Sequence, residues 1–422
     1  MRILYVAHRT PYPPNKGDKI RSFNQLHHLG QRHEVYLACL ADDPADLAHR
    51  AALEAFCRSV EVVRLDRRLA KVRSLCYLPT GRPLTLPYFY VPALARAVRR
   101  LCRDHDFDLA YAFSSSMAQY IVNVPGVARV LDMVDVDSDK WRQYSLYTNG
   151  LRAGLYKLEW KRMQAYERSV TGQVDRTLVI APAETQILKR LNPDAAVSEV
   201  PNGIDEAWFA AQGPWPVTPE LLAAQPYVVF TGAMDYFANV DGVTFFAREV
   251  WPRVRRQVPA LRFYIVGMNP APAVRALGAR DSSIVVTGFV PDTRPYLSHA
   301  AACIVPLRIA RGVQNKVLEA MAVGVPVVAT PPALEGLAVA DGREVLCGHD
   351  PAALAEALVR AVQRPQDSRE RVERARRLVK TQYAWPAILD RLEALLGLEH
   401  ERFRQRQNGA PAGAAAPPLP SR

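Results

Sequence analysis

The sequence predicts an α/β protein made of two doubly wound parallel sheets, each covered by helices. With 422 residues the chain is longer than one core usually supports, so two domains are expected. Short apolar runs of strand type alternate with helical patterns in both halves, which is typical of parallel sheets. A proline-rich stretch at 206–226 separates the two series and is typical of an interdomain linker.

Each apolar run is short and is followed by a turn or a helical pattern. The expected strands of the first half are residues 2–7, 34–39, 60–65, 109–113, 129–131, 176–180 and 197–200. Those of the second half are residues 227–231, 262–266, 284–286, 302–305 and 325–329. We therefore expect domains at 1–205 and 227–384, a last amphipathic helix at 385–400 and a disordered Ala/Pro/Gly-rich tail at 401–422.

Composition narrows the class of protein. The net charge of +12 is spread over both halves and accompanies no nucleic-acid motif, so an anionic ligand or an anionic membrane surface is expected and a nucleic-acid partner is not. Basic stripes at 96–103 and 157–168 are either solvated helix faces or an interfacial patch. There is no signal-peptide layout, no long apolar span and no cysteine pair with metal spacing, which favours a cytoplasmic protein.

The most informative segment surrounds a helix with a single acid. If this helix begins near Gly312 or Val313, Gly312, Asn315, Lys316 and Glu319 share one face. Free backbone amides at such an end attract phosphate. Lys316 would add a positive charge, and Glu319 could accept hydrogen bonds from a ribose diol. The segment therefore predicts a nucleotide-diphosphate site.

A second segment is rich in acids. Asp132, Asp135, Asp137 and Asp139 follow a predicted strand end. They could orient sugar hydroxyls, act as a base, or bind Ca²⁺ or Mg²⁺, although the spacing lacks the glycine and distal glutamate of an EF-hand loop. A solvated acidic turn with a helix cap is the alternative.

Glycines mark three further loops at strand ends. Gly17 lies in a proline-rich loop after the first strand and permits close approach of a ligand, whereas the absence of G-x-G-x-x-G argues against a dehydrogenase. Gly232 opens a strand–glycine–helix crossover. The turn that contains Phe289 and Val290 is placed to meet a flat base.

Taken together, four stretches resemble the GT-B glycosyltransferases of family 4. They are residues 11–21, 131–141, 201–205 and 312–329, and the resemblance extends over the first 400 residues. It is greatest to the sugar transferases of exosortase-type (PEP-CTERM) exopolysaccharide loci. The resemblance implies two Rossmann-like domains facing a cleft, with the donor nucleotide on the second domain, the acceptor on the first, and a last helix that crosses back to the first.

The resemblance also implies roles for individual residues. In the donor site Glu319 would hold the ribose hydroxyls, and Lys316 and Arg308, with the amides of Gly312 and Val313, would hold the diphosphate. Elsewhere Gly17 would approach the phosphates, Phe289 and Val290 would flank the base, and Asp132 or Asp135 would lie near the reacting sugar.

The chain departs from the family at two places. Arg311 occupies the position of a second acid, and Met234 and Asn239 lie where the family has an arginine and a lysine. Arg308 and Arg311 can supply the missing cations, because guanidinium groups pair bidentately with phosphate.

The implied reaction transfers a hexose from a nucleotide diphosphate sugar to a saccharide acceptor, which we expect to be polyprenyl-linked. The transfer would retain the anomeric configuration and would need no metal or other cofactor. The enzyme would be cytoplasmic or peripheral on the inner membrane. Two alternatives stay open, namely a sugar-nucleotide epimerase of the same fold and a non-catalytic scaffold at the membrane surface.

Overall fold

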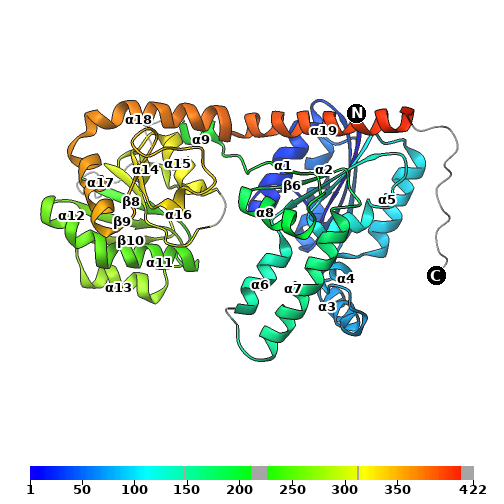
Figure 1. Ribbon diagram of the computed structural model, residues 1–422, viewed down its shortest axis with the longest axis horizontal. Helices are drawn as coiled ribbons and strands as arrows, with labels where there is room; N and C mark the ends of the chain where they lie inside the picture. The colour runs from blue at the N-terminus through cyan, green and yellow to red at the C-terminus, as the bar shows by residue number, and fades with distance from the viewer. Residues whose placement is uncertain (147, 211–225, 311–312, 410–422) are drawn as a thin grey trace. The chain divides into compact units, whose positions relative to one another are not determined.

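The computed structural model describes residues 1–146, 148–210, 226–310 and 313–409. The chain divides into two compact units. Unit 1 consists of Met1–Val200 and Leu389–Arg422, and unit 2 consists of Pro201–Ile388. Each unit contains one parallel sheet with helices on both faces (Figure 1). This confirms the predicted fold class.

The sheet of unit 1 has seven strands in the order β3-β2-β1-β4-β5-β6-β7. They are β1 Arg2–Ala7, β2 Glu34–Ala41, β3 Ser59–Arg64, β4 Leu109–Phe113, β5 Ala128–Val134, β6 Arg176–Val179 and β7 Val197–Glu199. The central strands are almost wholly apolar because helices cover both faces of the sheet. The strand order reverses between β1 and β4, and ligands of such sheets bind at the carboxyl ends beside this reversal.

The helices of unit 1 start where the sequence provides a cap or a proline. Asp66 caps α3 through its side chain, and Pro92 opens α5, which buries Leu94, Val98 and Leu101. The helices are α1 Gly17–Gly30, α2 Arg50–Glu54, α3 Arg67–Cys76, α4 Thr85–Phe89, α5 Pro92–Asp104, α6 Asp137–Leu146, α7 Leu151–Val170 and α8 Pro182–Leu191, with short 3-10 turns at Pro44–His49, Leu78–Thr80 and Ser115–Tyr120.

The sheet of unit 2 has the order β10-β9-β8-β11-β12-β13 and reverses between β8 and β11. Its strands are β8 Tyr227–Thr231, β9 Arg262–Val266, β10 Ile284–Gly288, β11 Ala302–Val305, β12 Val327–Ala329 and β13 Leu346–Cys347. The sequence does not predict β13, because two residues are too few to show a strand pattern.

The helical segments of unit 2 surround its sheet. They are α9 Glu206–Ala210, α11 Phe237–Phe245, η4 Phe246–Val250, α12 Trp251–Gln257, α13 Pro272–Arg280, α14 Arg294–Ser298, α15 Asn315–Val323, α16 Pro331–Leu334, α17 Pro351–Gln363, α18 Pro365–Leu378 and η5 Val379–Tyr383. Helix α9 lies at the start of the expected linker, and residues 211–225 are outside the described part of the chain.

The last helix, α19, runs from Trp385 to Gly409 and so continues beyond the expected end at residue 400. From Leu389 onward it belongs to unit 1. Arg176 donates to Glu399, at 3.0 Å from Nε. Arg406 pairs with Asp175, at 2.5 Å. These ion pairs hold the helix on unit 1 past the predicted boundary. No described helix has the length and apolar character needed to cross a bilayer.

The segment after β7 is fixed within unit 2. The Ile204 N–H donates to the Tyr383 carbonyl (2.9 Å), and the Trp385 N–H donates to the Ile204 carbonyl (3.1 Å). A Cβ placed on Gly203 would lie 2.6 Å from the Trp385 ring and 2.8 Å from its Cα. Glycine is therefore required here by close packing.

We expect Gly203→Ala to lower the free energy of unfolding by about 1–3 kcal/mol, since neither ring nor backbone of Trp385 can easily move away. Gly397→Ala is the matched control. It lies within α19 with nothing within 4 Å of its Cβ position, so it should stabilise by roughly 0.5–1 kcal/mol. Urea unfolding followed by circular dichroism measures both, and equal effects of the two variants would contradict the packing argument.

Candidate functional site

Helix α15 begins at the carboxyl edge of the second sheet with an uncapped end. Its N-cap residue, Gln314, has extended backbone angles (φ −86°, ψ 101°), and no side chain of the described residues caps the first turn. The helix thus starts at Asn315, later than the predicted start near Gly312 or Val313. The N–H groups of Asn315 and Lys316 donate to no acceptor in the described structure, so this end can bind an anion.

Lys316 occupies the first turn of α15 and points back to the end of β8. Its Nζ donates to Asn239 Oδ1 and lies 4.5 Å from the centre of the Phe230 ring. Burial lowers the pKa of Lys316 to about 8. The ammonium is therefore poorly hydrated, and a bound anion would compensate its charge.

Glu319 lies one turn further along the same face. It is partly buried, and in the described part of the chain its carboxylate has no hydrogen-bond or ion-pair partner. Burial raises its pKa, while the charge of Lys316 opposes that rise. A half-buried acceptor without donors is costly for the fold, and this favours a role in binding a ligand that supplies hydroxyl donors.

Gly232 brings the backbone close to this pair. It follows β8 with φ 154°, and a Cβ at this position would lie 3.2 Å from Lys316 Nζ and 2.8 Å from Asn239 Nδ2. Asn239, on α11, also donates to the Ala233 carbonyl (2.9 Å) and so fixes the loop. No role for Asn239 was predicted from the sequence, although its place in the first turn of the helix after the Gly232 loop was a usable signal.

Arg308 has a different partner from the one expected. Its guanidinium forms a two-point ion pair with Asp241 of α11 (Nε–Oδ2 2.9 Å), and its side chain is half exposed. An ion pair at such exposure is weak, so a diphosphate can compete for the arginine. The structure nevertheless places Arg308 with Asp241 and not with the groups of α15.

The remaining donor-site candidates vary in how they are placed. Phe289 is 69% exposed on the loop after β10, where a base can stack on it. Val290 and Val313 instead pack against the core of unit 2. Asn315 is exposed as the first helical residue. Arg311 and Gly312 lie outside the described residues.

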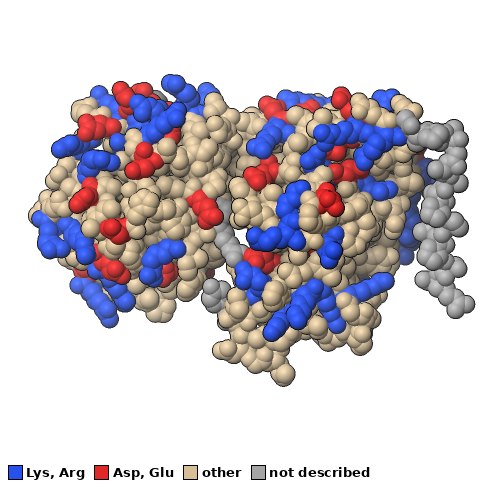
Figure 2. All heavy atoms as spheres, viewed as in Figure 1, with Lys and Arg blue, Asp and Glu red and all other residues tan. Residues whose placement is uncertain are grey.

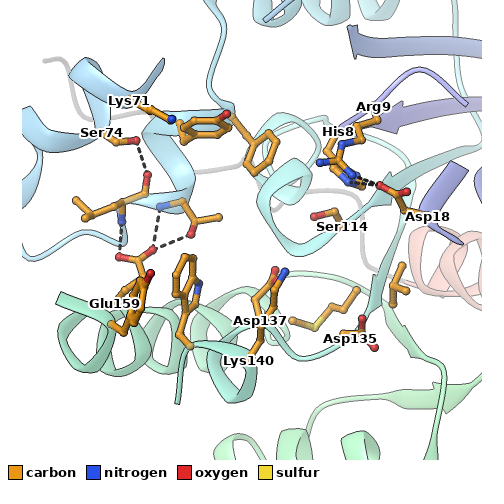
Figure 3. A pocket seen from close by; sticks show the side chains of 18 of the residues that line it. His8, Arg9, Asp18, Lys71, Ser74, Ser114, Asp135, Asp137, Lys140 and Glu159 are labelled. Atoms are coloured by element: carbon orange, nitrogen blue, oxygen red, sulfur yellow. Dashed lines mark hydrogen bonds and ion pairs between the residues drawn. The ribbon is translucent and has the colours of Figure 1, made fainter. Parts of the chain in front are cut away.

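Unit 1 contains a cavity of about 690 Å³ beside the carboxyl ends of β1, β4 and β5. Figure 3 shows His8, Arg9 and Asp18 at one side of it, and Lys71, Ser74 and Glu159 at the other. Aromatic and aliphatic side chains complete its walls, among them Tyr88, Phe89, Trp141, Leu155 and Tyr156. The cavity can therefore hold a ligand that has both polar and apolar parts.

Asp132 does not line this cavity. It is fully buried, and its carboxylate accepts from Arg21 Nε (3.0 Å), Gln25 Nε2 (2.8 Å), Tyr111 Oη (2.8 Å) and the Val134 N–H (3.1 Å). These four donors occupy the acceptor positions of the carboxylate. We therefore assign Asp132 to the core, where it ties α1 to β4 and β5, and correct the expectation that it lies near a reacting sugar.

Asp135, in contrast, is exposed in the cavity wall. Crowding by protein atoms raises its pKa, and the carboxylate of Asp137 adds to the rise. Burial likewise raises the pKa of Glu184, at the start of α8, to about 8, with Asp135 as the next cause. The charge of Asp135 therefore favours the protonated form of Glu184 near neutral pH. The sequence did not reveal Glu184, because it lies on a later helix.

The loop after β1 adds an imidazole, that of His8, which was not predicted from the sequence. His8 Nε2 lies 3.3 Å from Asp18 Oδ2, and Arg9 Nη1 lies 2.6 Å from the same oxygen. Burial tends to raise the pKa of Asp18, but the contacts with His8 and Arg9 outweigh it and lower that pKa well below its usual value. Gly17 begins α1 beside this group, and no described atom beyond its chain neighbours lies within 4 Å of a Cβ built on it.

Residues 225–364 match the family model "Glycosyl transferases group 1", a stretch that runs from β8 through α17 and includes α15. A search of curated proteins finds no match.

Solved structures similar to the chain span nearly all of it. Sucrose-phosphate synthase from Thermosynechococcus elongatus has a TM-score of 0.65 at 17% identity, covering 97% of this chain and 100% of that one. HepE from Anabaena, solved with UDP and glucose, has a TM-score of 0.63 at 14% identity, covering 94% and 100%. A glycosyltransferase from Rickettsia africae has a TM-score of 0.61 at 11% identity, covering 94% and 98%. The chain therefore has the fold of GT-B glycosyltransferases.

Proposed function

We propose that the protein is a glycosyltransferase that binds a nucleotide diphosphate sugar on unit 2 and transfers the sugar to an acceptor bound on unit 1. One observation carries the proposal. Lys316 and Glu319 place a poorly hydrated cation, and a carboxylate that no described residue pairs with, one turn apart at the start of α15. This arrangement matches the adjacent diphosphate and ribose diol of a sugar nucleotide. The Anabaena protein HepE, which shares the fold, has been solved with UDP-glucose.

The chemistry follows from the charge that develops on the leaving group. As the bond between the anomeric carbon and the diphosphate oxygen breaks, negative charge accumulates on the diphosphate. Lys316 and the first N–H groups of α15 stabilise that charge without reorganisation, which lowers the barrier to departure. In this proposal no metal is needed, Glu319 holds the ribose, and Phe289 stacks on the base.

The acceptor part of the proposal rests on the cavity of unit 1. Its polar end at the strand termini suits sugar hydroxyls, and its apolar walls suit a lipid carrier. We therefore infer that the acceptor is a polyprenyl-linked saccharide. From the resemblance of the sequence we infer that a hexose is transferred with retention. The same resemblance leads us to propose a role in exopolysaccharide assembly of the PEP-CTERM type. Asp135 is the acid best placed to contact the acceptor.

A panel of UDP-, GDP-, ADP- and dTDP-linked sugars, measured by thermal shift, tests the donor site. The matching nucleotide should raise the melting temperature in a concentration-dependent way. Mass spectrometry of a polyprenyl-linked saccharide, incubated with that donor, should then show the added sugar, and NMR should show its anomeric configuration. Absence of any stabilisation would overturn the proposal. Isomerisation of the donor when incubated alone would replace it with the epimerase alternative.

The titration of Lys316 predicts the pH dependence of donor binding. Because burial lowers its pKa to about 8 in the free protein, the lysine loses its charge as pH rises through this value. The affinity for a nucleoside diphosphate should be level between about pH 7, where the terminal phosphate is fully ionised, and this value, and should fall above it by up to about tenfold per pH unit. Calorimetry in buffers of different ionisation enthalpy should show proton uptake on binding above pH 8. An affinity that stays level up to pH 10 would exclude Lys316 as the phosphate ligand.

A further inference from the structure

Two helical elements of unit 1 expose large apolar side chains. On α3, Leu69 and Val72 are 67% and 61% exposed, one turn apart on the same face. At the turn between α6 and α7, Leu146 and Leu151 are 67% and 96% exposed. Single exposed leucines are ordinary, but a cluster of this kind on neighbouring elements marks an interaction surface.

Hydrogen bonds within unit 1 join the two elements. Glu159 of α7 accepts from the backbone N–H groups of Leu84 and Thr85, at 2.7 and 2.9 Å, and Arg162 of α7 donates to the Leu78 carbonyl, at 2.6 Å. These bonds join α7 to the chain between α3 and α4, and Figure 1 shows both helix pairs extending from the same side of the unit. The exposed apolar residues therefore form one face, called here the α3/α6–α7 face.

Basic residues surround this face, and acids are nearly absent from it. Residues 67–91 and 140–158 include several Lys and Arg but no Asp or Glu. Arg68, Lys140, Arg152 and Lys157 are exposed. In Figure 2 the lower end of the unit is uncharged at its tip, with Lys and Arg atoms just above it. An apolar tip within a basic rim complements a bilayer with anionic headgroups, since the tip enters the acyl boundary and the rim stays at the phosphates.

The basic stripe on α5 lacks this combination. Arg96, Arg99 and Arg100 are exposed, but every large apolar residue of α5 is buried. Arg100 is paired with Glu61 (2.7 Å), and Arg103 with Asp104 (2.9 Å). A solvated face, one of the two alternatives that the sequence left for this stripe, explains α5. The other alternative, an interfacial patch, applies to the α3/α6–α7 face.

The cavity of unit 1 opens at this face. Lys71 and Leu75 of α3 are exposed and also line the cavity, as does Lys140 of α6. We propose that the α3/α6–α7 face docks on an anionic lipid bilayer and that the cavity receives its acceptor directly from that bilayer. The second half of this statement rests on the proposed function, whereas docking itself needs no nucleotide and no acceptor.

Vesicle co-sedimentation of the full chain, without nucleotide, tests the docking. The protein should bind vesicles made of equal parts phosphatidylglycerol and phosphatidylcholine, bind pure phosphatidylcholine far less, and dissociate at high salt. The double variants Leu69→Glu/Val72→Glu and Leu146→Glu/Leu151→Glu should each lose at least about tenfold in partitioning. In Arg152→Glu/Lys157→Glu the partitioning onto vesicles should fall at least about twentyfivefold, since each basic residue near an anionic surface raises partitioning roughly fivefold.

Leu398→Glu is the matched control. Leu398 is 40% exposed on α19, at the far side of the same unit in Figure 1, and its substitution should leave vesicle binding unchanged. All the substituted side chains are exposed, so the variants should keep the melting temperature and the nucleoside diphosphate affinity of the parent protein.

Three results would overturn the proposal. They are equal binding of all variants, no vesicle binding by the parent protein, and self-association that the leucine variants abolish without any vesicle binding. The last result would assign the face to a second copy of the chain. Failure of the proposed function would be distinct, because it would appear as absent nucleotide binding while vesicle binding persisted.

Discussion

Lys316→Ala is expected to weaken binding of the free nucleoside diphosphate by roughly a hundredfold, the effect of losing a charge-assisted hydrogen bond of up to about 3 kcal/mol. The reason is the position of the ammonium. It lies at the uncapped start of α15, over the Phe230 ring, with burial already reducing its hydration. Isothermal titration calorimetry with UDP and GDP measures the change directly, without knowledge of the acceptor.

Two controls make this result specific. Lys380 is an exposed lysine on η5 of the same unit, and Lys380→Ala should leave the affinity unchanged. Asn239→Ala should have an intermediate effect, because it removes the acceptor that aims Nζ while keeping the charge. If Lys316→Ala bound the diphosphate as tightly as the parent protein, the assignment of the diphosphate site to the start of α15 would be wrong.

Glu319→Gln is expected to lower kcat/KM for transfer by about a hundredfold, since an amide has one acceptor oxygen instead of two and carries no negative charge to strengthen the hydrogen bonds from a ribose diol. Its effect on stability should go in the opposite direction. Burial raises the pKa of Glu319, so the ionised form disfavours folding, and this cost appears as pH rises above the pKa of the unfolded chain. The neutral amide removes the cost, and the melting temperature at neutral pH should stay level or rise.

The combination of lost turnover and retained stability separates a ligand-binding residue from a structural one. Asp132→Asn provides the contrast. Four donors surround that carboxylate, so the substitution should lower the melting temperature as well as activity. A Glu319→Gln variant that unfolded early, or that transferred sugar at the full rate, would contradict the assignment.

Local patterns in the sequence determined the fold class and the face of α15. Strand positions followed from short apolar runs, because a strand covered on both sides by helices must be apolar throughout. The shared face of Lys316 and Glu319 followed from helical spacing alone. Spacing of this kind depends on the backbone period and not on distant parts of the chain.

Only the tertiary structure decided which charged groups are free. Asp132 and Asp135 are three residues apart and look alike in sequence, yet one accepts four hydrogen bonds in the core and the other lines a cavity. Arg308 is paired with Asp241, and the charge of Asp135 helps to raise the pKa of Glu184, although each pair joins separate elements. A side chain's type and spacing determine what chemistry it can perform. Whether it is available for that chemistry depends on burial and on partners, which long-range packing supplies.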